Sequence, residues 1–159
     1  MDRYKMEDLK KWKNSTNRKP LIIRGARQVG KTWLMQEFGR KYYEKYAYIN
    51  FDDNTRMNSL FNEDFNIEKI IQGLKIESGV NIEPENTLII LDEIQETPRA
   101  LKALKYFCEN AREYHVISAG SLLGVAIHEG TSFPVGKVDF MDLMPLSFFE
   151  FLDALGQKD

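Results

Sequence analysis

The feature that most constrains the fold is a glycine-containing loop that directly follows a short apolar run. The apolar residues Leu21-Ile22-Ile23 precede Gly25, and after four further residues comes Gly30-Lys31-Thr32. This is the spacing of a phosphate-binding loop, in which glycines let the backbone curl so that successive N–H groups point into one concavity. Such a loop needs a buried strand before it and a helix after it, because the helix N-terminus adds the positive end of its dipole.

The side chains of this loop have expected tasks in holding a nucleotide. We expect Lys31 to reach the β- and γ-phosphates and the Thr32 hydroxyl to ligate Mg²⁺. The residues predicted to bind the nucleotide are Gly25, Ala26, Arg27, Gln28, Val29, Gly30, Lys31, Thr32 and Trp33. The alternative is a glycine turn between a strand and a helix, with Lys31 merely solvated. A helical pattern from Lys31 to about Phe38, expected to end at Gly39, favours the nucleotide site.

The composition indicates one soluble globular domain with a core, because 43% of the 159 residues are hydrophobic. The formal net charge is −2, so bulk electrostatics do not support nucleic-acid binding. Cys108 is the only cysteine, which excludes a disulfide framework and favours a buried helix position. The sequence shows neither a signal-peptide core nor an apolar run that could span a bilayer, so we expect no membrane partner and a cytoplasmic location.

Apolar runs alternate with helical patterns along the chain. Strands are expected at Leu21–Arg24, Tyr46–Phe51, Leu88–Leu91, His115–Ala119 and Val138–Leu143. Helices are expected over residues 66–78, from about Pro98, and over Ser147–Leu155, and Asp53 or Asn54 is expected to cap a helix after the second strand. Strands that alternate with helices predict a parallel α/β sheet with helices on both faces.

Residues 1–19 are expected to form a helical lead-in to a core that spans residues 20–159. Seven basic and three acidic residues give this segment a local net charge of +4, and Tyr4, Leu9 and Trp12 fall on one apolar stripe. Two interpretations of its basic face stay open. It contacts the nucleotide base or an acidic partner surface, or it is a solvated face over a stripe packed on the domain.

An acidic pair ends the third expected strand. Asp92 and Glu93 follow the continuous apolar run Leu88–Leu91, which is typical of a strand buried on both faces of a parallel sheet. A carboxylate at the end of such a strand can hold Mg²⁺ or its water shell, so Thr32 and Asp92 are the predicted metal ligands. Glu93 is expected to polarise the water that attacks the γ-phosphate. The alternative is a pair of acids of which one caps the next helix.

Other polar residues are less specific candidates. Ser121 is expected to contact the γ-phosphate or the attacking water, Ser118 is a weaker candidate, and either hydroxyl could instead bond local backbone. The predicted catalytic residues are therefore Lys31, Glu93 and Ser121. Charges that could reach a neighbouring subunit's phosphate, among which spacing does not choose, are Arg56, Arg99, Arg112 and Lys137. The two histidines, His115 and His128, lack the spacing of a metal site and are interpreted as structural.

Several segments together carry a family resemblance. They are Arg24–Thr32, Leu91–Gln95, Gly120-Ser121, Pro145–Phe148 and Glu150-Phe151. Over nearly its whole length the chain resembles prokaryotic AAA-type ATPases that carry a C-terminal domain of uncharacterised function. The resemblance implies an α/β P-loop NTPase three-layer sandwich, whose five-stranded parallel sheet has the order 5-1-4-3-2. It also implies that Asp92 and Glu93 form the second acidic motif and that Ser121 lies near the sensor position.

Two departures from the family pattern accompany the resemblance. Gly136-Lys137 stands where members usually have Gly-Arg, which argues against an arginine-specific role there, and relatives continue beyond this length, so the chain looks like their N-terminal part. The sequence therefore predicts an ATP-binding, Mg²⁺-dependent ATPase domain that forms a homo-oligomer or binds a protein partner. Alternatives are a slow or non-hydrolysing ATP-gated switch, a small-molecule kinase, which Asp92-Glu93 disfavours, and a DNA-directed motor, which the charge does not support.

Overall fold

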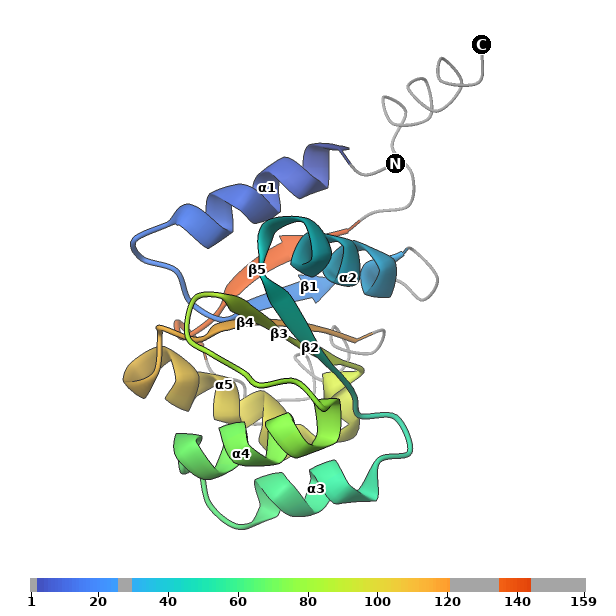
Figure 1. Cartoon of the computed structure of the whole chain (residues 1–159), viewed down its shortest axis with the longest axis vertical. Coiled ribbons are helices and arrows are strands. Elements are labelled where there is room, and N and C mark those ends of the chain that lie inside the picture. The colour runs from blue at the N-terminus through green and yellow to red at the C-terminus, as the bar shows by residue number, and fades with distance from the viewer. Residues whose placement is uncertain (1–2, 26–29, 121–134, 144–159) are drawn as a thin grey trace.

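Five strands form a single parallel sheet. The computed structural model describes residues 3–25, 30–120 and 135–143. The strands are β1 (Leu21–Arg24), β2 (Lys45–Asn50), β3 (Thr87–Asp92), β4 (His115–Ala119) and β5 (Asp139–Asp142). Every neighbouring pair is parallel and the order is β2-β3-β4-β1-β5 (Figure 1). This confirms the α/β class, and it confirms the order 5-1-4-3-2 that the family resemblance implied.

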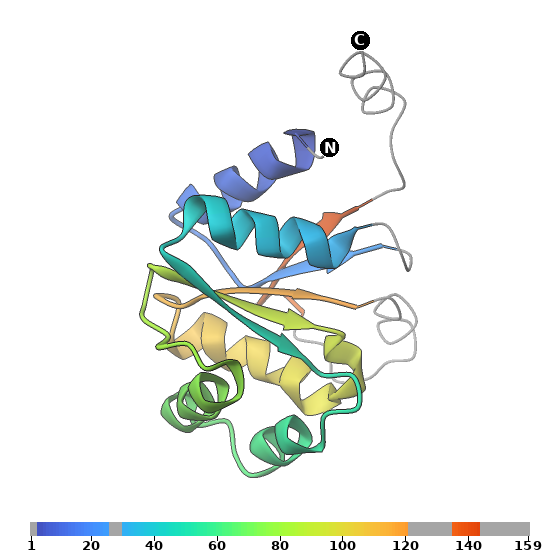
Figure 2. The same cartoon turned by 45° about the vertical axis from the view of Figure 1, so that its right-hand side comes forward.

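Helices cover both faces of the sheet and make three layers. They are α1 (Arg3–Asn14), α2 (Lys31–Tyr42), α3 (Thr55–Asn62), α4 (Ile67–Ser78) and α5 (Pro98–Asn110), and a short 3-10 helix, η1 (Ile94–Glu96), follows β3. Figure 2 shows α1 and α2 on one side of the sheet and α3, α4 and α5 on the other. The crossover helices lie on the faces because parallel strands cannot be joined by tight hairpins.

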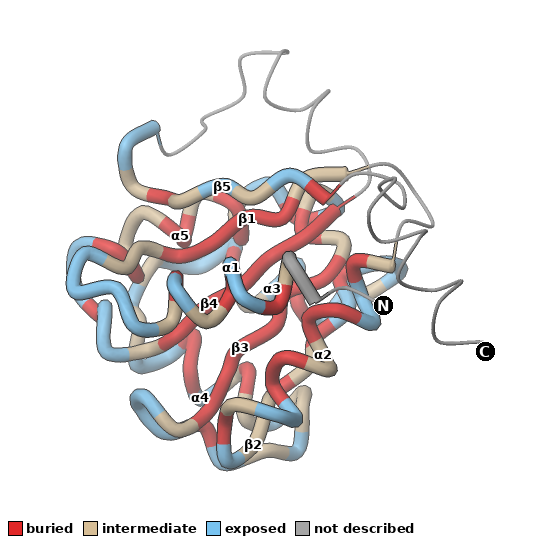
Figure 3. Tube along the Cα trace, turned by 90° about the horizontal axis from the view of Figure 1, so that it is seen from above, coloured by how far each residue is buried: buried red, intermediate tan, exposed pale blue. Residues whose placement is uncertain are grey.

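Strand β3 shows how one apolar run serves two cores. Leu88 and Ile90 pack with side chains of α1 and α2, whereas Ile89 and Leu91 pack with side chains of α3, α4 and α5. Successive side chains of a strand point to opposite faces, so a strand covered on both sides must be apolar at every position. Figure 3 shows the central strands as the buried interior of the molecule.

Most of the expected helix positions agree with the structure. Asn54 caps α3 by accepting a hydrogen bond from the backbone N–H of Met57, and Pro98 is the first residue of α5. Cys108 is buried on α5, as expected. Leu9 and Trp12 of α1 are buried against α2, which fits the predicted apolar stripe of the lead-in. The division of the chain at residue 19 stays a prediction.

The expectation that Gly39 ends the helix after the loop is wrong. Helix α2 continues through Gly39 to Tyr42, and Gly39 is buried. A Cβ atom at this position would lie 2.7 Å from the Cβ atom of Tyr46 on β2. The glycine is therefore needed because α2 packs closely against the sheet. From the sequence alone, a glycine required for close packing cannot be told from a glycine that ends a helix.

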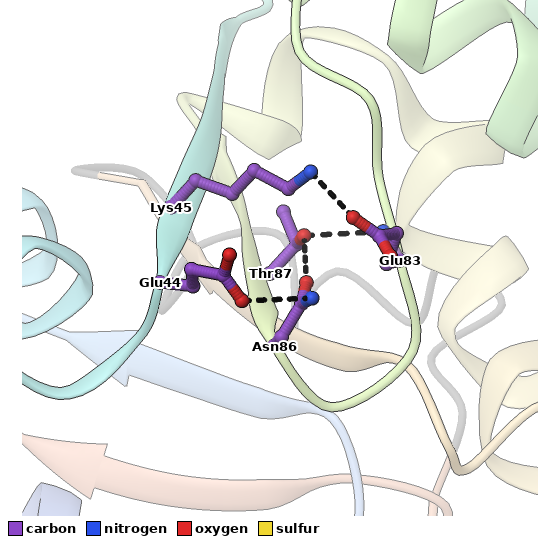
Figure 4. A network of polar contacts seen from close by, with 5 residues as sticks. All are labelled: Glu44, Lys45, Glu83, Asn86 and Thr87. Carbon is purple, nitrogen blue, oxygen red and sulfur yellow. Dashed lines mark hydrogen bonds and ion pairs between the residues drawn. The ribbon is translucent and has the colours of Figure 1, made fainter.

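A polar network ties β2 to β3 at the amino ends of the two strands (Figure 4). Lys45 donates a 2.6 Å hydrogen bond to Glu83, and the Asn86 amide donates to Glu44 at 3.1 Å. The Thr87 hydroxyl donates to the Asn86 side-chain oxygen at 2.7 Å and accepts from the backbone N–H of Glu83. These contacts help to fix the register of β2 against β3. That register also determines which residues are opposite one another at the carboxyl ends of the two strands.

Several predicted features lie outside the described residues. They are Ala26, Arg27, Gln28 and Val29 of the loop, Ser121, His128, and the expected helix Ser147–Leu155 with the preceding Pro145. In the part of the chain that is described, no helix is both long enough and apolar enough to cross a bilayer.

Candidate functional site

The candidate site lies at the carboxyl ends of the strands. Gly25 directly follows β1, Asp92 is the last residue of β3, and α2 begins at Lys31. In open α/β sheets, ligands bind in the crevice outside the carboxyl ends of the strands. The start of the predicted phosphate-binding loop and the acidic end of β3, which are about sixty residues apart in sequence, therefore lie at the same end of the parallel strands.

Thr32 and Asp92 are in direct contact. The Thr32 hydroxyl donates a 2.6 Å hydrogen bond to Asp92 Oδ2, and Asp92 is 3% exposed. Asp92 lies on the α2 side of the sheet because it is two residues past Ile90, which packs on the same face. The structure therefore brings together the two side chains that the sequence predicts as metal ligands.

Lys31 is turned inward at the start of α2. Its side chain donates a 2.8 Å hydrogen bond to the carbonyl oxygen of Gly25, and the residue is buried. Burial lowers the pKa of the Lys31 ammonium, and the carboxylates of Glu93 and Asp92 oppose that change. Gly30 precedes the helix with φ +86°, a left-handed conformation that glycine adopts without strain. The N-terminus of a helix carries the positive end of its dipole, so the start of α2 favours a bound anion.

Glu93 is held by its neighbours on both sides. Its backbone N–H donates a 3.0 Å hydrogen bond to Asp92 Oδ1, and its Oε2 atom accepts a 2.8 Å hydrogen bond from the Gln95 amide. The backbone of Glu93 is left-handed, with φ +55°. A non-glycine residue in this conformation is strained by roughly 1–3 kcal/mol, and such strain concentrates at functional sites. Among the described residues the buried Gln95 Oε1 atom has no hydrogen-bond partner.

Tyr48 is the site residue that sequence reasoning missed. Its hydroxyl donates a 2.6 Å hydrogen bond to Asp92 Oδ2, the same oxygen that accepts from Thr32. Burial and the hydrogen bond to Asp92 raise the pKa of the Tyr48 phenol. The sequence did contain one signal for Tyr48, because the alternation along β2 places Tyr48 and Asn50 on one face of the strand. To identify Asp92 as the partner of Tyr48, however, the register between β2 and β3 must be known.

Other candidates are placed less favourably. Trp33 is 47% exposed on the first turn of α2. Ser118 is buried and shares a strand face with Val116, which packs on the α5 side, and its hydroxyl has no partner in the described part of the chain. That face is opposite to Thr32 and Asp92, so the geometry disfavours the γ-phosphate contact considered for Ser118.

The four basic side chains considered as partners for a neighbouring subunit's phosphate contact groups of their own chain. Arg56 pairs with Glu77, and Lys137 pairs with Glu109. Arg99 donates to the carbonyl oxygen of Phe61, and Arg112 donates to that of Cys108. None of these four contacts involves a residue of the loop or of the acidic pair in the described ranges.

The basic face of α1 is also partly used within the molecule. Lys13 donates to the carbonyl oxygen of Tyr42 and lies over the Tyr43 ring, and Arg18 donates to the carbonyl oxygens of Lys13 and Arg112. Lys10 contacts Glu7 and the ring of Tyr42. These contacts favour the interpretation of α1 as a packed helix with a solvated face.

The donor set suits Mg²⁺ better than a softer metal. Within residues 3–25, 30–120 and 135–143, no group of three or more histidine, cysteine or carboxylate side chains could hold a metal alone. Mg²⁺ prefers oxygen ligands and is commonly held by one or two carboxylates together with substrate phosphates and water. A hydroxyl from Thr32 and a carboxylate from Asp92 beside a phosphate-binding loop fit that pattern.

Comparisons with known proteins agree with this architecture. A family model described as an AAA domain matches residues 17–152. The Walker-type ATPase PABY2304 of Pyrococcus abyssi superposes with a TM-score of 0.59 at 17% identity, covering 98% of this chain and 57% of that chain. The Aeropyrum pernix ORC1 protein, solved in complex with DNA, superposes with a TM-score of 0.58 at 16% identity, covering 98% of this chain and 47% of that chain.

At these identities the two structures show the fold alone. This chain spans about half the length of each of them. The search of curated proteins found no match. The family assignment therefore rests on the domain match, which covers most of the chain.

Proposed function

Because this chain belongs to the AAA domain family of P-loop ATPases, we propose that it binds ATP with Mg²⁺ and hydrolyses the γ-phosphate. The observation that carries the proposal is the 2.6 Å hydrogen bond between Thr32 and Asp92. It joins the end of the phosphate-binding loop to the acidic end of β3, and a nucleotide-bound Mg²⁺ needs oxygen ligands from both.

In this proposal the loop holds the phosphates. The backbone N–H groups from Gly25 through Thr32 surround the phosphate oxygens, and the Lys31 ammonium exchanges its bond to the Gly25 carbonyl for the β- and γ-phosphates. Thr32 and Asp92 hold the metal, which neutralises phosphate charge when bound. Trp33, which follows Thr32 in the first turn of α2, is proposed to line the nucleotide site.

Glu93 is proposed to orient the attacking water. Its carboxylate directly follows the metal-binding Asp92, and its Oε2 atom is held by Gln95 at 2.8 Å. A carboxylate in this place can accept a hydrogen bond from water and align it with the γ-phosphate, which is general-base work. Ser121 stays a proposed contact to the γ-phosphate or the water.

The test is the substitution Glu93→Gln, which keeps the shape of the side chain and removes its charge. We expect ATP binding to be retained while phosphate release falls by about 10²-fold or more. Glu96→Gln is the matched control, because Glu96 is an exposed carboxylate at the end of the short helix that Glu93 precedes, and it should hydrolyse at the parent rate. Unimpaired hydrolysis by Glu93→Gln would contradict the assigned role.

A slow or non-hydrolysing ATP-gated switch is the second candidate. It is favoured by the contacts that occupy the site's own groups, namely Lys31 on the Gly25 carbonyl and Gln95 on Glu93. A single-turnover assay and a binding isotherm on the same preparation separate the two. Tight binding with turnover much slower than nucleotide exchange would favour the switch.

The partner of the whole protein is a separate question. The ORC1 protein among the structural matches was solved with DNA, whereas the net charge of this chain is −2. We propose that the domain forms a homo-oligomer or binds a protein partner. Stimulation of phosphate release by DNA would favour a DNA-directed motor instead, and phosphate release without any acceptor would exclude a kinase.

A further inference from the structure

The carboxylate of Asp92 accepts more hydrogen bonds than its predicted metal role requires. Oδ2 accepts from the hydroxyls of Thr32 and Tyr48, both at 2.6 Å, and Oδ1 accepts from the backbone N–H of Glu93 at 3.0 Å. An ionised carboxylate offers about four lone-pair directions. Three donors therefore leave about one direction for a further ligand, and that direction is fixed in space.

The sheet itself brings Tyr48 to Asp92. In the β2–β3 register, Asn50 is opposite Asp92 and Tyr48 is opposite Ile90, so Tyr48 and Asp92 are diagonal neighbours on one face. Diagonal pairs are within reach of aromatic side chains but not of short ones. The ring of Tyr48 packs against the core under α2, on the side where Thr32 lies. The phenol thus reaches the end of β3 from β2, the edge strand next to it.

The hydrogen bond from Tyr48 restricts the orientation of the Asp92 carboxylate. The terminal torsion of an aspartate is broad, so a carboxylate bonded only to Thr32 could turn when that hydroxyl moves to a metal. Tyr48 comes from β2 and Thr32 from α2, so the two hydrogen bonds to Asp92 Oδ2 do not depend on the same element.

We propose that Tyr48 is a positioning residue for the magnesium site: its hydroxyl fixes the orientation of Asp92 and so sets how strongly Mg²⁺ increases the affinity for ATP. The inference rests on the proposed function, because it takes Asp92 to be a metal ligand. It assigns Tyr48 no contact with the nucleotide. Removal of the hydroxyl should therefore act on the metal-dependent part of binding alone.

The experiment measures ATP binding to the full chain by calorimetry, once with Mg²⁺ and once with EDTA. The ratio of the two affinities is the gain due to Mg²⁺. In Tyr48→Phe we expect this gain to fall by about tenfold, as is typical when a group that orients a metal ligand is lost. The affinity in EDTA should equal that of the parent.

Tyr43→Phe is the matched control. Tyr43 is also hydrogen-bonded through its hydroxyl at 2.6 Å, but its partner is the buried His115. Its variant should keep both affinities. If Tyr48→Phe does not fold, two analogues of similar shape at position 48 test the role of the hydroxyl, namely 4-fluorophenylalanine and 4-aminophenylalanine. The fluoro variant cannot donate and should show the low gain, whereas the amino variant can donate and should recover most of it.

The possible results are distinguishable. An unchanged or larger Mg²⁺ gain in the variants that cannot donate overturns the role of Tyr48. An equal loss of affinity with Mg²⁺ and with EDTA also overturns it, because that is the result of general damage to the fold. If the parent itself shows no ATP affinity that Mg²⁺ increases, the proposed function fails and the inference fails with it.

Discussion

At the scale of single residues, His115 illustrates a buried group that has no part in the proposed chemistry. Its Nδ1 atom and the Tyr43 hydroxyl are 2.6 Å apart, and its ring meets Trp12 and Tyr43 edge to face. Burial, together with the charges of Arg18 and Lys13, lowers the pKa of His115 to about 4. The expectation that this histidine is structural agrees with these contacts.

This pKa predicts a pH dependence of stability. The unfolded chain protonates His115 near pH 6.5, whereas the folded chain resists protonation down to about pH 4. The unfolded state therefore binds more protons in this window, and the free energy of unfolding should fall by up to about 3 kcal/mol as the pH drops from 6.5 to 4. Above pH 6.5 the contribution is complete.

Denaturant unfolding at several pH values, on the parent and on His115→Gln, measures this contribution. The variant should lose part of the slope between pH 6.5 and pH 4, whereas both proteins should share the slope that arises from carboxylates at lower pH. His128 is present in both proteins and cancels in the comparison. Parallel curves over the whole range would contradict the assignment.

At the scale of secondary-structure elements, two glycines within helices make opposite predictions. A Cβ atom at Gly39 of α2 would lie 2.7 Å from the Cβ atom of Tyr46, which the strand backbone fixes. The three atoms nearest to a Cβ atom at Gly73 of α4 would all belong to the side chain of Leu60, and two of them are its methyl ends, which can rotate away. The same change thus meets a rigid obstacle in one helix and a flexible one in the other.

We expect Gly39→Ala to lower the free energy of unfolding by about 1–2 kcal/mol, because overpacking exceeds the gain in helix propensity. Gly73→Ala should be neutral or raise it by about 0.5–1 kcal/mol, since the propensity gain then dominates. Denaturant unfolding of both variants measures the difference. Equal effects of the two changes would show that the close approach of α2 to β2 does not constrain position 39.

The elements were predictable from sequence to different degrees. The strand β3 was evident because a run that is buried on both faces is apolar at every residue, and the predicted bounds of the other strands agree within about one residue. The helical role of Gly39 was not evident, because the contact with Tyr46 that requires a glycine is between separate elements. For the same reason the sequence indicated Thr32 and Asp92 as candidates but not Tyr48, whose contact with Asp92 depends on the register between β2 and β3.

At the scale of the whole molecule, the sheet order determines what the site can be. Periodicity predicted parallel strands, but it contains no information on which strands are neighbours, and only the family resemblance implied 5-1-4-3-2. That order places β4 between β1 and β3, so the loop after β1 and the acid at the end of β3 are separated by one strand. Helix α2 begins after the loop that follows β1, and its first turn brings Thr32 into contact with Asp92 at the end of β3.

A ligand that contacts both the loop after β1 and the end of β3 should stabilise the entire domain. ATP and Mg²⁺ together would connect α2, the loop after β1 and the end of β3, and a ligand at a hundredfold excess over its dissociation constant stabilises the folded state by about 2.7 kcal/mol. We expect the thermal midpoint to rise with ATP and Mg²⁺ and to rise less at the same ATP concentration when EDTA removes the metal. The metal-dependent part should depend on Asp92.

The variant Asp92→Asn tests this dependence, since an amide can still accept hydrogen bonds but binds Mg²⁺ poorly. Its unfolding midpoint should rise with ATP by the same amount in Mg²⁺ and in EDTA. Asp52→Asn is the control, because Asp52 is an exposed acid just after β2 that makes no contact with the loop in the described residues, and it should behave as the parent does. If Asp92→Asn keeps the full metal-dependent increase, the metal is held by other groups. The hydrogen bond between Thr32 and Asp92 then only stabilises the packing of α2 against the end of β3.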